Sequence, residues 1–146
     1  MTVSSGKTGR GVKFEVGDGQ SPENWTTVAN VTTINPTGRD SEEIDFTTLL
    51  SDGGFRELRQ GFKDPGTIGI TYHLDPTDAS HQDVLAKWLS GDVFEFRINF
   101  SGAGWNKALV GSAFMKNPGD ITIDVSNPMN AQSTVRVTGE TQFQDI

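Results

Sequence analysis

Residues 94–100, Phe-Glu-Phe-Arg-Ile-Asn-Phe, carry the clearest signal of the fold class in this chain. Apolar and polar side chains alternate along them, which is typical of a β-strand with one buried face. Shorter or less regular runs of the same kind lie at residues 13–16, 25–34, 43–47, 67–74, 105–115, 120–125 and 134–138. The pattern therefore predicts a mainly β protein with about seven or eight strands.

The last two of these runs are joined through Asn127-Pro128, a typical turn pair. We expect them to form a hairpin near the C-terminal end of the chain.

One helix is predicted, over residues 76–90. Asp75 suits its N-cap, Pro76 its first position, and Gly91 the left-handed residue that ends it. Its expected apolar stripe consists of Leu85, Trp88 and Leu89, with Val84 at the margin. Many strands and one helix predict a β-sandwich or barrel-like domain with a flanking helix.

A long inter-strand loop is expected over residues 48–66. A connection of this length in a compact domain is usually functional or disordered, and its many large apolar side chains argue against disorder. We predict that it docks on a neighbouring subunit. The predicted docking residues are Leu50, Phe55, Arg56, Leu58, Arg59, Phe62 and Lys63.

Length and composition restrict the class further. The 146 residues fit a flexible N-terminal arm at 1–12 and a single domain at 13–146. The chain has no cysteine, which excludes disulfides and Cys-ligated metals. Its net charge of −7 argues against a surface that binds phosphates tightly. No membrane span or secretory signal is visible, so we expect the protein to stay in a cytoplasm.

Catalytic and metal sites find little support in the sequence. The residues His73, Asp75, Asp78, His81 and Asp83 are close in sequence and offer metal-ligand side chains. A strand-to-helix break separates the two histidines, and carboxylates at a helix start already have a role there. No nucleophile motif is present. We predict no enzyme activity, no cofactor and no metal.

Two acidic strand faces remain to be explained, one with Glu43 and Asp45 and the other with Asp120 and Asp124. As a glycosidase pair, Glu43 and Asp45 are unconvincing, because a spacing of two on a strand places them side by side. An ordinary exposed sheet explains both faces. A surface that faces a polyanion without holding it is the alternative.

The order of these pieces resembles the tail tube (major tail) protein family of long non-contractile-tailed bacteriophages and related tail-like particles. Gly61-Phe62-Lys63-Asp64, followed by a strand, Asp75-Pro76 and a helix, is the most specific ordered set. The other matching positions are 11–16, 25–34, 44–45, 54–57 and 135–139.

The resemblance implies a structural virion protein whose six-fold rings stack into a hollow tube for genome delivery. Implied partners are the chain itself, a tape-measure protein, a tail terminator and a distal tail protein, with non-specific passage of double-stranded DNA and no membrane. The implied location is the virion tail, after assembly in the bacterial cytoplasm. Glu43, Asp45, Asp120 and Asp124 would then line the lumen.

Two alternatives remain open at this point. The first is another tail or baseplate ring protein, or a secretion-system tube protein, with the same fold. The second is a carbohydrate-binding β-sandwich that uses Trp25, Trp88 or Trp105 as a sugar platform.

Overall fold

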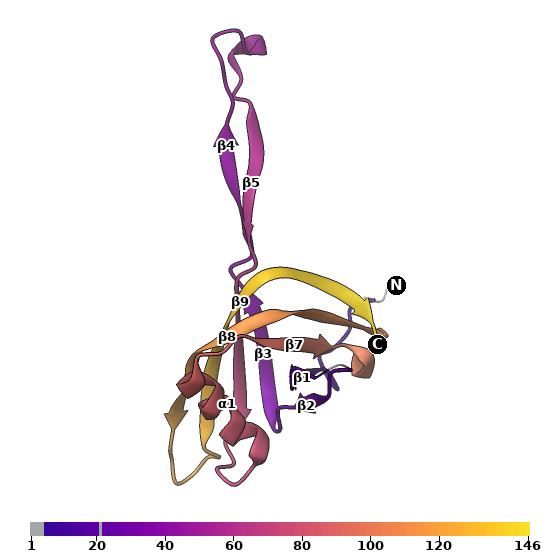
Figure 1. The fold of residues 1–146 in the computed structure, drawn as a ribbon, viewed down its shortest axis with the longest axis vertical. Coiled ribbons are helices and arrows are strands. Elements are labelled where there is room, and N and C mark those ends of the chain that lie inside the picture. The colour runs from indigo at the N-terminus through magenta and orange to yellow at the C-terminus, as the bar shows by residue number, and fades with distance from the viewer. Residues whose placement is uncertain (1–4, 21) are drawn as a thin grey trace, which may run out of the picture.

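The computed structural model describes residues 5–20 and 22–146. They form a seven-stranded antiparallel sheet in the order β2-β1-β7-β8-β9-β6-β3 and a separate two-stranded sheet, β4-β5 (Figure 1). The strands are β1 Lys13–Gly17, β2 Trp25–Thr27, β3 Val31–Thr37, β4 Asp40–Asp45, β5 Leu58–Asp64, β6 Thr67–His73, β7 Phe94–Asn99, β8 Lys107–Thr122 and β9 Asn130–Asp145. The helices are α1, Ala79–Ser90, and two 3₁₀ turns, Asp52–Gly54 and Ser101–Ala103.

Alternating strands supply the core, as predicted. Ile68, Ile70 and Tyr72 of β6 are buried, as are Phe96 and Ile98 of β7, while the residues between them are partly accessible. The mainly β class with one α-helix is confirmed, and neither sheet closes into a barrel.

The large sheet curls so that its two ends approach each other (Figure 1). Just beyond β2, the Val28 amide donates to the Phe14 carbonyl of β1 at 3.0 Å, and Val28 is buried among the core residues. The core therefore lies inside the curl, as in a sandwich.

Strand boundaries differ from the expectation at two places. The runs at 105–115 and 120–125 belong largely to one strand, β8, which pairs with β9 in the predicted C-terminal hairpin. The run at 25–34 is split into β2 and β3 at Asn30, whose φ of 61° turns the chain. A left-handed asparagine is a local turn signal that apolar spacing does not show.

The expected loop over 48–66 is shorter than predicted. Residues 58–64 form β5, which pairs with β4 in an antiparallel hairpin. The expected N-terminal arm, 1–12, lies partly outside the described residues. Of its last residues, Val12 packs against the core, and Gly11 lies against Gly102.

The helix begins later than predicted. Asp78, not Asp75, is the N-cap of α1, and its carboxylate accepts from the Ser80 amide. Asp75 instead closes a turn by accepting from the Thr77 amide at 3.0 Å. Gly91 ends the helix in the left-handed conformation, as predicted.

The apolar stripe predicted for the helix was wrong. α1 buries Ser80, His81 and Val84 against the sheet. Leu85, Trp88 and Leu89 remain 48%, 45% and 70% exposed. The helix therefore packs through Val84 and two polar residues and turns its larger apolar side chains outward. No helix in the described part of the chain is long and apolar enough to span a membrane.

Removing the helix cap should produce an acid-dependent loss of stability. The Ser80 hydroxyl and amide donate to Asp78 and hold its pKa below the ordinary aspartate value. A lowered folded pKa stabilises the protein above the ordinary value, and this contribution disappears as the pH falls through the folded pKa. Asp78→Ala should thus lower the melting temperature at neutral pH, by less at strongly acid pH.

Asp78→Asn is the matched control, since asparagine caps a helix about as well as aspartate. An Asp78→Ala deficit that is undiminished at low pH would contradict this role of the carboxylate.

Candidate functional site

The most conspicuous feature outside the core is the hairpin of β4 and β5 with its tip, residues 40–64, which we call the arm. It projects from the body of the protein along the long axis of the molecule (Figure 1). Within the described residues, no hydrogen bond or ion pair joins residues 41–63 to the body. The arm is therefore held only at its base.

The base of the arm is built around Gly38 and Gly66, with φ of 77° and 84°. A Cβ on Gly66 would lie 2.2 Å from the Thr37 carbonyl oxygen, so only glycine fits. The Asp64 carboxylate accepts from the Gly66 amide at 2.8 Å and pairs with Arg136 of β9 at 2.9 Å. These bonds, led by the Gly66 amide, lower the pKa of Asp64. They fix the direction in which the arm leaves the body.

The tip is an ordered turn. The Phe46 amide donates to the Glu57 carbonyl at 2.8 Å, and the Glu57 amide donates to the Thr47 hydroxyl at 2.8 Å. Asp45 accepts from Thr47, chiefly from its side chain, which lowers the pKa of Asp45. A further bond joins the Thr48 amide to the Ser51 hydroxyl at 2.9 Å. The backbone of the tip is thus shaped before any partner arrives.

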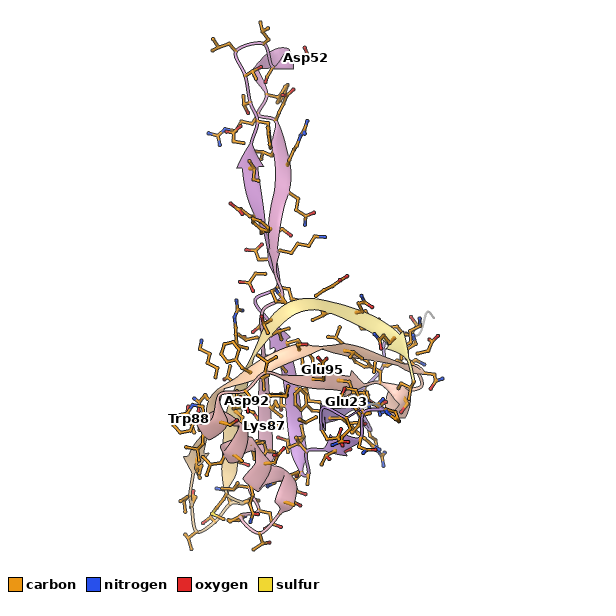
Figure 2. The ribbon with its side chains drawn as sticks, in the orientation of Figure 1. Glu23, Asp52, Lys87, Trp88, Asp92 and Glu95 are labelled. Atoms are coloured by element: carbon orange, nitrogen blue, oxygen red, sulfur yellow. The ribbon has the colours of Figure 1, made fainter. Side chains whose placement is uncertain are left out.

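The arm exposes its large apolar side chains. Leu49, Leu50 and Phe55 at the tip are 105%, 90% and 78% exposed, and Phe62 on β5 is 87% exposed. Figure 2 shows side chains along the whole arm, up to Asp52 at the tip, standing away from the body. A concentration of exposed apolar groups on a monomer is typical of an interaction surface.

The predicted docking residues all lie on the arm. Leu50, Phe55 and Arg56 are in the tip, and the others follow on β5. Leu58 pairs with Asp45 and Arg59 with Ile44, so these two residues lie on opposite faces of the hairpin, and a β-bulge then interrupts the alternation between Gln60 and Lys63. The Arg59 guanidinium lies 4.8 Å from the centre of the Phe46 ring.

The four predicted acidic residues are not brought together. Glu43 and Asp45 lie on β4 in the arm, whereas Asp120 lies near the end of β8, and Asp124 lies in the loop that follows it. The β8–β9 loop is at the opposite end of the molecule from the arm tip (Figure 1). Asp124 closes its own turn by accepting from the Ser126 amide at 3.0 Å.

The residues considered as metal ligands have protein partners. The His73 ring bonds Asn130 at 2.8 Å, and the His81 ring bonds the Ala29 carbonyl at 2.6 Å. Asp75 and Asp78 close turns, as described above. Within the described residues, no group of three or more His, Cys, Asp or Glu side chains is placed to hold a metal ion.

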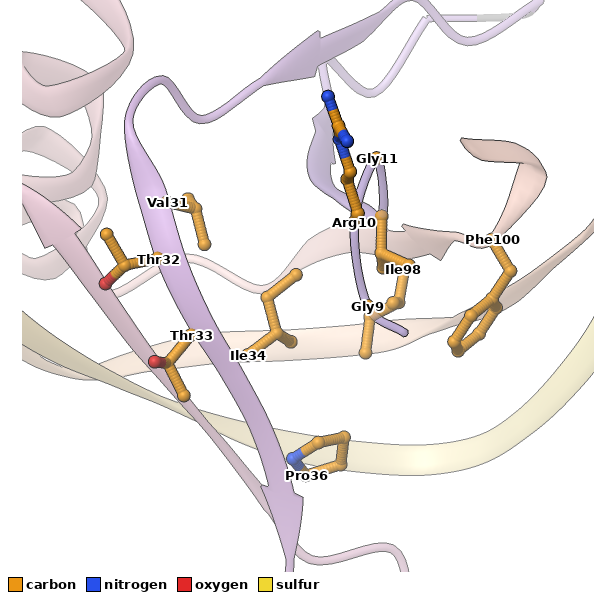
Figure 3. Close-up of a pocket in the computed structure, with 11 residues that line it drawn as sticks. Gly9, Arg10, Gly11, Val31, Thr32, Thr33, Ile34, Pro36, Ile98 and Phe100 are labelled. Atoms are coloured by element: carbon orange, nitrogen blue, oxygen red, sulfur yellow. The ribbon is translucent and has the colours of Figure 1, made fainter. Parts of the chain in front are cut away.

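A hollow lies between the segment that precedes β1 and the edge strand β3 (Figure 3). Its walls include Val31, Ile34, Pro36 and Phe100, with Arg10 at its rim. Among its described lining residues, Arg10 is the only ionisable one. The hollow suits apolar packing rather than acid–base chemistry.

Two of the three tryptophans are engaged with other side chains. The Arg97 guanidinium lies 4.7 Å from the centre of the Trp25 ring, and Trp105 packs against Phe100 and Phe143. Trp88 is the one on the exposed face of α1. Helical spacing predicts this apolar face correctly, but not that it lies outside the core.

Comparison with known proteins identifies relatives of this architecture. Residues 10–140 match the family model described as phage tail tube, TTP, lambda-like. No curated protein sequence matches the chain significantly.

Three solved structures illustrate the shared fold. The tail of an empty gene transfer agent particle, refined with C6 symmetry, aligns over 95% of this chain and 99% of its own, at 18% identity and a TM-score of 0.77. The SPP1 tail tube aligns over 95% and 79%, at 16% identity and a TM-score of 0.68. The sheath–tube complex of an extracellular contractile injection system, PVC, aligns over 99% and 95%, at 12% identity and a TM-score of 0.67. At these identities the likeness establishes the fold.

Proposed function

This chain belongs to the lambda-like phage tail tube family, and from that membership we propose that its copies close into six-fold rings that stack into a hollow conduit for DNA. The family is a structural one, and its members form tail tubes. The observation that carries the proposal is the arm, whose apolar side chains have no partner surface on their own body.

Burial of the arm on a neighbouring copy supplies the driving force. Burying one large apolar side chain contributes about 1.5–3 kcal/mol. Leu50, Phe55, Leu58 and Phe62 are at least half exposed in the monomer, so each has such a gain available. Arg56, Arg59 and Lys63 add charges that can meet acidic groups of the neighbour.

The edge strands of the large sheet offer a second contact, between neighbouring copies within one ring. β2 and β3 are the two edges of the seven-stranded sheet. An edge strand presents unpaired backbone groups, and closure into a ring of copies covers them. The apolar hollow along β3 is available to the same contact.

The proposed assembly is tested by electron microscopy of the purified protein. Long hollow tubes with six-fold end views are expected. A protein that stays monomeric at high concentration, or forms only isolated rings, would contradict the proposal. We further propose that assembly in the bacterial cytoplasm involves a tape-measure protein, a tail terminator and a distal tail protein. The reason is that a tube of defined length needs a component that sets its length and components that close its two ends.

Passage of DNA needs a wall that does not hold phosphates. The net charge of −7 favours this, because like charges weaken contact with the polyanion. We propose Glu43, Asp45, Asp120 and Asp124 as contributors to the acidic wall. Since the two pairs lie at opposite ends of the molecule, each pair is tested separately.

Charge reversal should separate delivery from assembly. One residue of each pair is changed, Glu43→Lys or Asp120→Lys, because Asp45 and Asp124 each close a turn by accepting from a backbone amide. Each variant is expected to leave tubes intact and to slow DNA delivery by particles that contain it. The reason is that a lumenal lysine attracts the phosphates that a carboxylate repels. Lys116→Glu is the control, because it adds negative instead of positive charge and so should not slow delivery. Normal delivery through intact variant tubes would remove the residue concerned from the wall.

A further inference from the structure

We infer that the arm tip of one copy seats on the outer face of α1 of a copy in the next ring. This receptor assignment rests on the proposed stacking of rings and adds the surface that receives the arm. The receptor surface, here called the α1 ridge, consists of Leu85, Trp88, Leu89 and Val93.

The α1 ridge is an apolar surface that its own fold leaves uncovered. Its four side chains are 48%, 45%, 70% and 60% exposed, and three of them lie on a helix whose inward side is Ser80, His81 and Val84. A helix normally turns its larger apolar side chains toward the core. The reversed arrangement on α1 is explained if another protein surface covers the ridge.

The position of the ridge selects the arm tip as its occupant. α1 lies in the half of the body that is remote from the arm, next to the β8–β9 loop at the far end, as Figure 1 shows along the longest axis of the molecule. Head-to-tail stacking along that axis brings the tip of one copy to the α1 end of the next. Such an interface is heterologous, with two different surfaces that meet at every ring, and it therefore propagates into a tube.

The charges around the ridge agree with this occupant. Val93 also lines a hollow whose acidic lining residues are Asp18, Glu23, Asp92 and Glu95. Figure 2 labels three of these, Glu23, Asp92 and Glu95, together with Lys87 of α1. Lys87, the cation on this lining, already pairs with Asp83 at 3.5 Å. In the tip, Arg56 follows directly after Phe55. A tip whose Phe55 lies on the ridge can therefore place Arg56 at this acidic hollow.

A cysteine pair tests the contact directly, because the parent chain has no cysteine. Leu50→Cys and Leu89→Cys are both exposed substitutions that leave the core unchanged. In assembled tubes of the double variant, a short thiol-reactive cross-linker is expected to give a ladder of covalent dimers, trimers and larger chains. Either single variant should give no ladder, since a heterologous contact pairs position 50 with position 89.

The matched control combines Leu50→Cys with Val125→Cys, which is fully exposed at the same end of the body but on the β8–β9 loop. Tubes that cross-link through position 125 and not through position 89 would overturn the receptor assignment and leave the tube proposal standing. Absence of tubes from the parent chain would overturn both.

A mixing experiment covers the case in which the double variant does not assemble. The two single-cysteine chains are then mixed with excess parent chain. The expected product in the mixed tubes is a cross-linked dimer that contains one chain of each kind. Mixed tubes without this dimer would contradict the contact.

Discussion

Replacement of the arm, residues 40–64, by an Asn-Gly turn is expected to give a folded monomer that makes no tubes. The body should fold because no residue of the arm belongs to the buried core. β3 and β6 already pair directly below the arm, up to Thr37 opposite Thr67, and a short turn can join strands in this register.

The loss of assembly should be complete, because every subunit loses the same contact and a tube repeats that contact at each ring. The replacement also removes the ion pair between Asp64 and Arg136. Exposed pairs of this kind contribute little to stability, so the melting temperature should stay near that of the parent. Circular dichroism, sedimentation velocity and electron microscopy together measure the three outcomes.

A milder variant checks that the apolar tip, and not the mere presence of a hairpin, is responsible. Leu50→Asp with Phe55→Asp keeps the arm but should also abolish tubes, whereas Asp52→Asn in the same tip should not. Normal tubes from the armless variant would refute the role of the arm.

The second large effect concerns the buried ion pair between β1 and β7. Glu15 is 5% exposed, and its carboxylate accepts from Arg97 Nε at 2.7 Å and from Asn99 Nδ2 at 3.0 Å. Glu15→Leu leaves the guanidinium and the amide without this acceptor. Breaking a buried pair by removing one partner costs about 3–5 kcal/mol. We expect about 3 kcal/mol, because the Arg97 side chain is 20% exposed and can reach water in part.

The double variant Glu15→Leu with Arg97→Met should recover most of this loss, because no buried charge then remains unpaired. Urea unfolding of the parent, the two single variants and the double variant gives the coupling free energy. Asp145→Asn, which breaks the exposed pair with Lys107 at 3.4 Å, is the control and should change stability little. A double variant as unstable as Glu15→Leu would contradict the argument.

The same ion pair also matters for the edge of the sheet. Because β1 pairs with the edge strand β2, the Glu15–Arg97 pair helps to hold that edge in place.

The sequence predicted the elements whose burial is decided within one chain. Phe94–Asn99 and Thr67–His73 alternate cleanly because one face of each strand meets the core. The left-handed Gly91 was predicted because a helix end has a local signal.

The same reasoning did not predict that the arm is a hairpin of two strands. β5 has solvent on both faces in the monomer, so Leu58 and Phe62 show no apolar alternation against a core. Its second strand is therefore predicted as a loop, and the docking role of the residues on it, which rests on their size and charge, stays a prediction. The helix start was misplaced because Asp75 and Asp78 both suit an N-cap, and only the turn at Thr77 separates them.

The α1 ridge shows a limit of periodicity itself. Leu85, Trp88 and Leu89 have the spacing of a buried stripe, and yet the buried side of α1 carries Ser80 and His81. Spacing reports that a face is apolar, but it does not report whether the covering surface belongs to the same chain. The acidic residues pose the same problem, since Glu43 and Asp120 alternate alike but lie at opposite ends.

Hydrogen exchange of the arm tip, measured in the monomer and in the assembled protein, tests most directly whether identical copies complete this fold. The tip amides bond within solvent-exposed turns, so in the monomer they should exchange faster than the amides of β7, which pair within the large sheet. On assembly the tip amides are expected to become strongly protected, with β7 unchanged. A tip that exchanges as fast in the assembled protein as in the monomer would contradict the account.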